Sequence, residues 1–285
     1  MMLWHALIDP FLSFGFMRRA LMACLALSLS AAPLGVFLLL RRMSLVGDAL
    51  SHAVLPGAAI GYLISGMSLV AMGVGGFIAG LAVAMLSGLV SRRTPLKEDA
   101  SFAGFYLGSL ALGVTLVSLR GSSVDLLHVL FGSILAVDAQ AMLMVGAIAS
   151  VSLLALAALY RALVIESFDV TFLRVNAPRR LALIHGLFLA LVVVNLVAGF
   201  QILGTLMSVG LMMLPAASAR FWARNLPQTL ATAMGIGALS SLIGLVWSYH
   251  ASLPAGPAIV LSASILFFVS ILFGTRGGIY AFARR

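Results

Sequence analysis

Apolar stretches of similar length follow one another along almost the whole chain, and short polar segments separate them. A helix needs about 20 predominantly apolar residues to cross a bilayer. Windows of this kind predict transmembrane helices at 20–40, 44–65, 67–90, 100–119, 138–160, 181–199, 201–219, 228–248 and 257–275. The sequence therefore predicts an all-α integral membrane protein, a polytopic helical bundle of about nine helices. An eight-helix bundle remains an alternative if the first segment does not cross completely.

The apolar segment 125–137 is too short to cross the bilayer. Backbone polar groups at membrane depth must be covered by protein or water, so this segment is predicted to form a short re-entrant or interfacial helix. It contains Asp125 and His128, which are three residues apart and would share one helix face near the outer surface. Residues 1–285 are expected to form a single transmembrane domain.

Apolar residues make up 62% of the 285 residues, and charged residues make up only 9%. A soluble globular domain has about 25% charged residues, so this composition excludes that class. The net charge of +9 is compatible with nucleic-acid binding, but the basic residues lie in the short segments between the apolar windows. Such a distribution is typical of membrane proteins. The expected partner is therefore membrane lipid and not nucleic acid.

Lys and Arg residues gather in alternate connections between the windows. Fourteen of the 17 lie inside if the segments 41–42, 92–97, 161–180 and 220–224 and the tail from 276 face the cytoplasm. Cytoplasmic loops carry this excess of positive charge. The chain is thus predicted to be a multi-pass protein of a bacterial-type inner (plasma) membrane, with its N-terminus outside and its C-terminus in the cytoplasm.

Residues 41–57 place polar chemistry at the start of the second window, and they read Arg-Arg-Met-Ser-Leu-Val-Gly-Asp-Ala-Leu-Ser-His-Ala-Val-Leu-Pro-Gly. Asp48 and His52 are four residues apart, so they share one face of a helix. With the membrane boundary near Met43 and a rise of about 1.5 Å per residue, His52 lies about 13 Å deep. Pro56 has no N–H to offer the carbonyl of His52. The site therefore presents a carboxylate, an imidazole and a freed carbonyl oxygen.

Ionisable side chains at membrane depth indicate function, because a charge there costs at least about 2.5–3.5 kcal/mol. A divalent cation would compensate the carboxylate, and mixed oxygen and nitrogen ligands suit manganese, iron or zinc. The alternative is that Asp48 and His52 satisfy only each other or a neighbouring helix. Zinc generally takes four ligands, and hard ions take about six. A homodimer would supply two Asp and two His, which one chain alone does not.

Small residues recur at four-residue spacing, which lets helix backbones approach closely in lipid. These stripes predict a tight bundle without identifying its function. They comprise Ala53, Gly57 and Gly61 on the second window, Gly76 and Gly80 on the third, and Gly104 and Gly108 on the fourth.

Other histidines are secondary candidates. His250 lies near the predicted outer surface, where it could form an entrance for an ion together with Asp125 and His128. Polar residues are nevertheless ordinary at the ends of spans. His185, near the inner end of the sixth window, is expected to make a structural hydrogen bond to another helix and not to be a ligand.

Residues 42–57 resemble the signature of the ABC-3 family, the membrane permeases of zinc, manganese and iron ABC importers. The similarity continues in family order through 130–137, 165–169, 211–219 and 253–260, so it covers the whole chain. It implies a homodimeric permease that carries a cytoplasmic ABC ATPase dimer and is fed by an extracytoplasmic metal-binding protein. It implies no permanently bound cofactor, since the transported metal is the cargo, with zinc preferred and manganese next.

The chain lacks a recognisable motif for ATP hydrolysis. P-loop ATPases need a glycine-rich loop that ends in Gly-Lys-Ser/Thr, and the only lysine, Lys97, has no glycine before it in 94–99. The chain is therefore predicted to be a permease subunit and not an enzyme. A separate ATPase subunit is expected.

The longest predicted cytoplasmic connection, at 161–178, is interpreted as a coupling loop. It mixes acidic and aromatic side chains in an amphipathic turn that suits docking in a groove. A helix lying on the membrane surface would show the same pattern. The resemblance favours coupling to the ATPase, with contacts from Glu166, Ser167, Phe168, Asp169 and Phe172.

The predicted function is the movement of divalent transition metal ions along a path at the homodimer axis by alternating access. Asp48 and His52 would line the path, while Pro56 and Pro215 would let helices bend between states. Two alternatives remain open: a proton-coupled secondary transporter that uses Asp48 and His52 as a relay, and an ABC permease for a metal chelate. An intramembrane metalloenzyme is disfavoured because no His-Glu-x-x-His sequence occurs.

Overall fold

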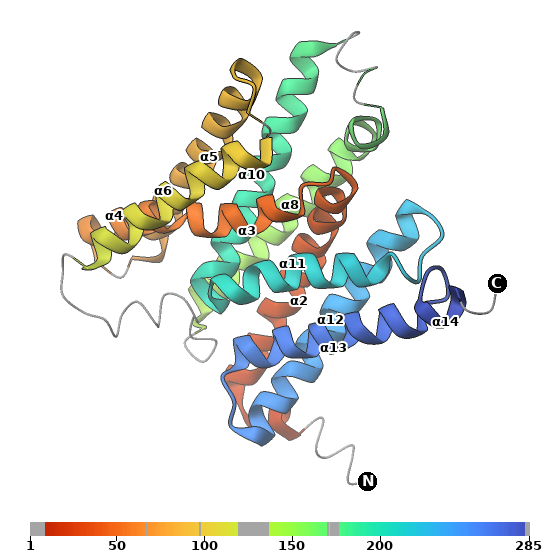
Figure 1. The fold of residues 1–285 in the computed structure, drawn as a ribbon. Helices are drawn as coiled ribbons and strands as arrows, with labels where there is room; N and C mark the ends of the chain where they lie inside the picture. The colour runs from red at the N-terminus through yellow and green to blue at the C-terminus, as the bar shows by residue number, and fades with distance from the viewer. Residues whose placement is uncertain are drawn as a thin grey trace.

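The computed structural model describes residues 9–66, 68–96, 98–118, 137–169, 171 and 177–282. Within these ranges all regular elements are helices, which confirms the predicted all-α class (Figure 1). Each predicted window coincides with one helix or with a pair of helices. The helices are α2 (Gly15–Leu40), α3 (Ser44–Ala53), α4 (Leu55–Ser65), α5 (Leu69–Arg93), α6 (Glu98–Ser118), α8 (Ala139–Phe168), α10 (Pro178–Leu203), α11 (Thr205–Ala219), α12 (Leu226–Ala251), α13 (Ala255–Phe273) and α14 (Ile279–Phe282).

Six helices in the described part of the chain, α2, α5, α8, α10, α12 and α13, are long and apolar enough to cross a membrane. Two further apolar helices are shorter: the apolar part of α6 (Ala100–Leu116) and α11. The second predicted span is divided into α3 and α4. The predicted short helix at 125–137 lies outside the described residues, except for Val137.

The division between α3 and α4 falls at Val54, two residues before a proline. Val54 keeps a right-handed helical backbone (φ −70°, ψ −28°), and Pro56 lies in the first turn of α4. A proline is tolerated in a first helical turn because the N–H it lacks would have no intrahelical partner there. Pro215, in contrast, lies inside α11 without dividing it. The predicted bending of both helices during transport stays a prediction.

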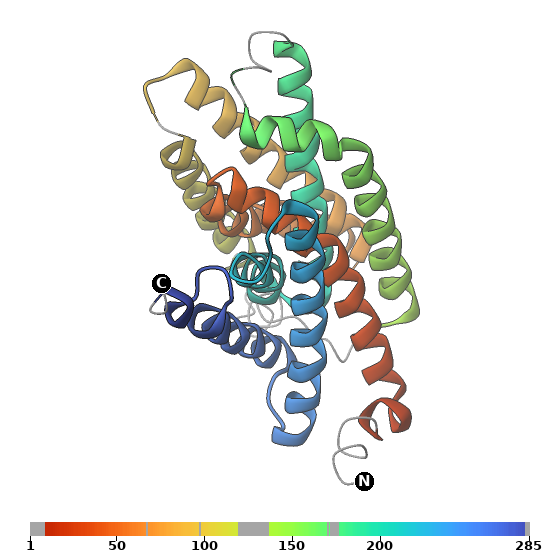
Figure 2. The ribbon, with the colours of Figure 1, turned by 90° about the vertical axis from the view of Figure 1, so that its right-hand side faces the viewer.

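Short helix α11 occupies the middle of the bundle, where it packs against α2, α3, α10, α12 and α13. Figure 2 shows it nearly end-on, with longer helices around it. The chain enters α11 from α10 through Gly204, whose backbone (φ 84°, ψ 166°) is strained for any residue with a side chain. Gly204 thereby turns the chain sharply from the end of α10 into α11.

Helices α4 and α5 approach each other through glycine. A Cβ atom added to Gly57 would overlap the carbonyl of Gly75, and one added to Gly61 would overlap the carbonyl of Ala71. The stripe on the second span therefore forms a helix contact, as its spacing indicates. On α6, Gly104 and Gly108 have no atom within 4 Å of an added Cβ among the described residues.

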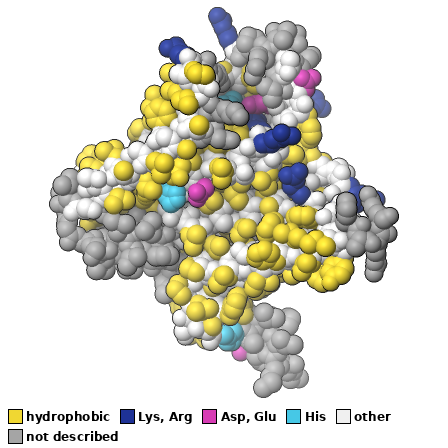
Figure 3. Space-filling view, in the orientation of Figure 1, with side chains coloured by type: hydrophobic (Ala, Val, Ile, Leu, Met, Phe, Trp, Pro, Cys, Tyr) yellow, Lys and Arg dark blue, Asp and Glu magenta, His cyan; other side chains and the backbone are white. Residues whose placement is uncertain are grey.

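The turns between helices divide into two groups by position. In Figure 1 the α2–α3, α5–α6 and α11–α12 turns lie towards the top and right, as do the end of α8 and the beginning of α10, and the α4–α5, α10–α11 and α12–α13 turns lie towards the lower left. The Lys and Arg side chains visible in Figure 3 lie in the upper and right-hand part of the same view. The basic side chains visible on this face thus gather towards one end of the molecule.

Helix α8 continues further than its apolar window predicts. The window ends at 160, whereas the helix ends at Phe168, with Asp169 as its C-cap. The first residues of the predicted loop at 161–178 therefore belong to a long helix. Only 169–177 separates α8 from α10.

Candidate functional site

Asp48 and His52 lie one turn apart on α3, as their spacing predicts. Asp48 Oδ1 is 3.8 Å from His52 Nε2, and the two side chains are 59% and 29% exposed. His52 Nδ1 is buried and has no hydrogen-bond partner among the described residues. At 3.8 Å the contact is too long for a hydrogen bond. Both groups therefore keep lone pairs for a further ligand.

The exposed position of this pair follows from how α3 packs. Val46, Leu50 and Val54 are buried in the main hydrophobic cluster, whereas Leu45, on the same face as Asp48 and His52, is 70% exposed. Figure 3 shows a histidine beside an acidic side chain, amid mostly apolar side chains, where α3 lies in Figure 1. The pair is thus open on one side of the chain.

Helix α6 supports α3 from the side. The ring of Tyr106 stacks on His52 with centroids 6.3 Å apart and an interplanar angle of 28°. The Ser109 hydroxyl donates a 3.0 Å hydrogen bond to the carbonyl of Ala53. A Cβ atom added to Gly113 would lie 3.0 Å from Leu55 and from Pro56. One stripe of α6 therefore holds both His52 and the α3–α4 junction.

The supporting residues of α6 were not predicted from the sequence. Tyr106, Ser109 and Gly113 are spaced by three and four residues, which places them on one helix face. This spacing was the only available signal, because nothing in the sequence pairs α6 with α3.

Asp48 and His52 do not form a complete metal site within one chain. No group of three or more His, Cys, Asp or Glu side chains that could hold a metal occurs in the described residues. A carboxylate oxygen and an imidazole nitrogen provide two donors, whereas transition-metal sites use four to six. The open face of α3 is where further ligands would have to approach.

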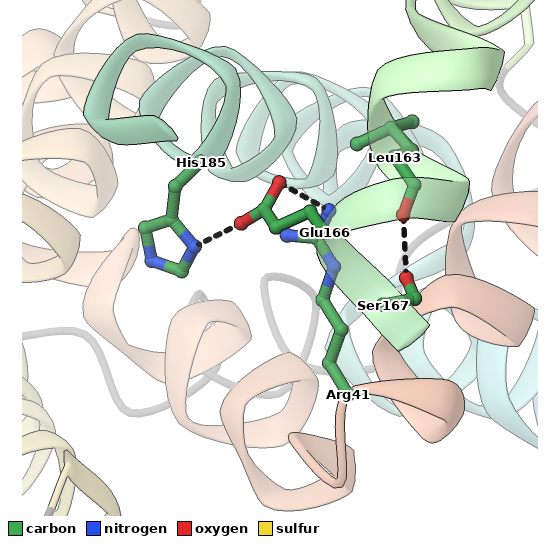
Figure 4. Close-up of polar contacts among 5 residues, drawn as sticks. All are labelled: Arg41, Leu163, Glu166, Ser167 and His185. Atoms are coloured by element: carbon green, nitrogen blue, oxygen red, sulfur yellow. Dashed lines mark hydrogen bonds and ion pairs between the residues drawn. The ribbon is translucent and has the colours of Figure 1, made fainter. Parts of the chain in front are cut away.

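A second polar cluster is buried between α2, α8 and α10 (Figure 4). Arg41 Nη2 lies 2.8 Å from Glu166 Oε2, and the two side chains are only 6% and 5% exposed. His185 Nδ1 lies 3.2 Å from Glu166 Oε1. The Arg41 guanidinium lies 4.2 Å from the ring centroid of Phe188, which is a cation–π contact. The predicted structural contact of His185 with another helix is confirmed.

Glu166 was expected to present its carboxylate to the ATPase, but its side chain points into the protein. Its partner Arg41 comes from a segment 125 residues earlier, so the local sequence carries no sign of the pairing. The Ser167 hydroxyl donates to the carbonyl of Leu163 within the same helix, at 2.7 Å. Phe168 is 69% exposed, and Asp169 is also exposed. Phe172 lies outside the described residues.

The candidates for an outer entrance are only partly described. His250 is exposed in the last turn of α12, where its ring packs edge-on against Tyr249 with centroids 5.2 Å apart. Asp125 and His128 lie outside the described residues. The predicted grouping of these three side chains stays a prediction.

Comparisons with known proteins identify a matching family and similar membrane proteins. The ABC 3 transport family matches residues 13–274. The chain is 35% identical over 272 residues to the manganese transport system membrane protein MntC of Listeria innocua, covering 95% of both chains. It is 34% identical over 269 residues to the manganese import system permease protein ScaB of Streptococcus parasanguinis, covering 94% of both chains.

A solved structure shares the whole fold. The structure of PsaBC from Streptococcus pneumoniae in complex with Fab superposes with a TM-score of 0.86 at 32% sequence identity, covering 98% of this chain and 99% of that one. The family match and these likenesses span nearly the full length of the chain. The chain therefore belongs to the ABC 3 transport family and is a multi-pass membrane protein.

Proposed function

We propose that the chain is the permease subunit of an ATP-driven importer of manganese(II), and that Asp48 and His52 line the path of the ion. The observation that carries this proposal is the open pair on α3, a carboxylate and an imidazole in contact at 3.8 Å within a mostly apolar face. Polar groups at membrane depth mark ion paths. A pair that is not already saturated by the protein can bind an ion and release it again.

Manganese replaces zinc as the preferred cargo. The zinc preference came from overall resemblance of the sequence, whereas the relatives MntC and ScaB carry manganese in their names. Carboxylate oxygen suits manganese, and imidazole nitrogen is acceptable to both metals. Zinc binds most sites more tightly than manganese does. Manganese would therefore leave such a site more readily than zinc, and an open site with few ligands suits the passage of manganese.

A second copy of the chain would complete the site. Asp48 is more than half exposed on the open face of α3, and a homodimer built around this face would bring two carboxylates and two imidazoles together. ATP hydrolysis would come from a separate cytoplasmic ATPase dimer, and an extracytoplasmic metal-binding protein would deliver the ion. These partners accord with the place of the chain in an ABC transporter family.

The orientation proposed for the chain places the N-terminus outside and the C-terminus in the cytoplasm. Support comes from the visible basic side chains that gather towards one end of the molecule, as the positive-inside rule requires. The α3–α4 junction and Pro215 are the proposed bending points for alternating access. The helix is already divided at Val54, just before Pro56, and Pro215 removes a backbone donor from the interior of α11.

Uptake into vesicles tests this function. The permease, reconstituted with its ATPase and its metal-binding protein, should accumulate radioactive manganese only when ATP is supplied. Excess unlabelled manganese should compete more strongly than zinc or iron(II). Collapse of the proton gradient should leave uptake unchanged. Uptake driven by a proton gradient without ATP would identify a secondary transporter, and uptake of manganese only as an organic complex would identify a chelate permease.

Replacing Tyr106 tests how α6 supports the site. Tyr106→Leu removes the ring that stacks on His52, so the imidazole should lose its fixed orientation and KM for manganese uptake should rise about tenfold, since supporting residues typically contribute 10- to 100-fold. Tyr106→Phe keeps the ring and should retain nearly normal KM. Equal defects in the two variants would show that the hydroxyl, and not the stacking, is what matters.

A further inference from the structure

The buried ion pair between Arg41 and Glu166 links the end of α8, where the ATPase is proposed to dock, to the turn that leads into α3 and its metal site. We infer that it transmits movement of the cytoplasmic end of α8 to α3, and so couples ATPase docking to the metal site. The inference rests on the proposed function, because it needs an ATPase that acts on the chain. It assigns Arg41 and Glu166 as positioning residues, since neither touches the ion.

On one side of the pair, Arg41 is tied closely to α3. It is the C-cap of α2, and only Arg42 and Met43 separate it from the first residue of α3. This turn is tight, because Met43 donates a 2.9 Å hydrogen bond to the carbonyl of Leu38 and Arg42 has φ 58°. Since the turn has little slack, a displacement of Arg41 displaces the start of α3 and with it Asp48.

On the other side, Glu166 is tied to an exposed helix end. It lies in the last turn of α8, two residues before Phe168, which is 69% exposed, and three before the exposed C-cap Asp169. A partner that contacts Phe168 and Asp169 therefore pushes on the same helical turn that holds Glu166. The carboxylate of Glu166 points inward, towards Arg41 (Figure 4). The side chain of Phe168 lies on the surface instead.

The two side chains of the ion pair form a rigid contact. Both side chains are about 95% buried, so water does not compete for their hydrogen bond, and separating the charges inside the protein is strongly unfavourable. His185 contacts the second carboxylate oxygen, and Phe188 covers the guanidinium. Helix α10 thus holds the pair from a third direction and leaves it a single geometry.

The decisive experiment separates coupling from folding. The transporter is reconstituted in vesicles with its ATPase and metal-binding protein, and manganese uptake and ATP hydrolysis are measured in the same preparation. Glu166→Gln should lower the manganese taken up per ATP by about tenfold, within the usual range of coupling between sites, while ATP hydrolysis continues. Arg41→Lys, which keeps the charge but loses the forked geometry, should lower the same ratio and provides a second reading if Glu166→Gln folds poorly.

Two residues of α8 serve as matched controls. Ser150→Ala removes an exposed hydroxyl that donates to the carbonyl of Gly146 within the same helix, at 2.8 Å, and it should leave the ratio unchanged. Leu163→Ala opens a cavity at a fully buried position and should reduce the amount of folded protein, so that uptake and hydrolysis fall together at a constant ratio. A normal ratio in Glu166→Gln and Arg41→Lys, or an equal fall in Leu163→Ala, overturns the inference. Failure of the wild-type protein to take up manganese would instead overturn the proposed function.

Discussion

Asp48→Asn and His52→Ala should each reduce manganese uptake by about 100-fold or more while leaving the amount of folded permease unchanged, because even outer-shell partners of a metal contribute 10- to 100-fold. Asp48→Asn preserves the shape of the side chain but removes the charge that attracts the ion. Asp48 is 59% exposed, His52 is 29% exposed and lies at the edge of the packed core, and their mutual contact is long, at 3.8 Å. The loss should therefore appear in transport and not in stability.

The measurement is radioactive manganese uptake, with the quantity of permease in the membrane determined alongside. Leu45→Ala is the matched control, since Leu45 is 70% exposed on the same face of α3 but has no metal-binding atoms. It removes only apolar contact from the face that the second copy would cover, so it should reduce uptake far less than Asp48→Asn or His52→Ala. Near-normal uptake by both Asp48→Asn and His52→Ala, at normal protein levels, would remove these residues from the ion path.

Gly75→Ala should strongly destabilise the fold, whereas the same change at Gly88 on the same helix should be harmless. A Cβ atom on Gly75 would overlap the carbonyl of Gly57 and lie 2.9 Å from its carbon. The obstructing atoms are backbone, so α4 and α5 would have to separate along their contact. Overpacking of a well-packed contact lowers the free energy of unfolding by about 1–3 kcal/mol. For Gly75→Ala the loss is expected at the upper end of this range, because backbone atoms cannot move aside.

Gly88 has no atom within 4 Å of an added Cβ among the described residues. Alanine is favoured over glycine in a helix by about 1 kcal/mol, so Gly88→Ala should be neutral or slightly stabilising. Thermal unfolding in detergent, followed by the fraction of permease that remains monodisperse, compares the two variants directly. Equal stability of Gly75→Ala and Gly88→Ala would contradict the close approach of α4 to α5.

The features that the sequence predicts correctly are those set by local spacing. Apolar windows located the helices because the bilayer imposes both the length and the character of a crossing segment. The four-residue spacing of Asp48 and His52 placed them on one face for the same local reason. Gly57 and Gly61 were expected at a helix contact, although the spacing did not reveal that α5 is the partner.

The features that the sequence does not reveal depend on partners that are distant in the chain, or on helices that continue beyond their apolar segment. Glu166 has the pattern of a docking residue, and its contacts with Arg41, 125 residues away, and with His185 hold it inward. Tyr106 and His52 meet through the packing of α6 on α3, which no local pattern records. Helix α8 passes Arg161 without ending, because a charge limits the depth of a segment in lipid but does not stop helix hydrogen bonding.

The short central helix of the bundle has a consequence for hydrophobic mismatch with the bilayer. With 15 residues, α11 is about 22 Å long, which is shorter than the roughly 30 Å hydrocarbon core of a bilayer. It packs against α2, α3, α10, α12 and α13, so its length need not match the thickness of the lipid. The longer neighbouring helices therefore absorb the hydrophobic mismatch that a 15-residue span alone would impose on the bilayer.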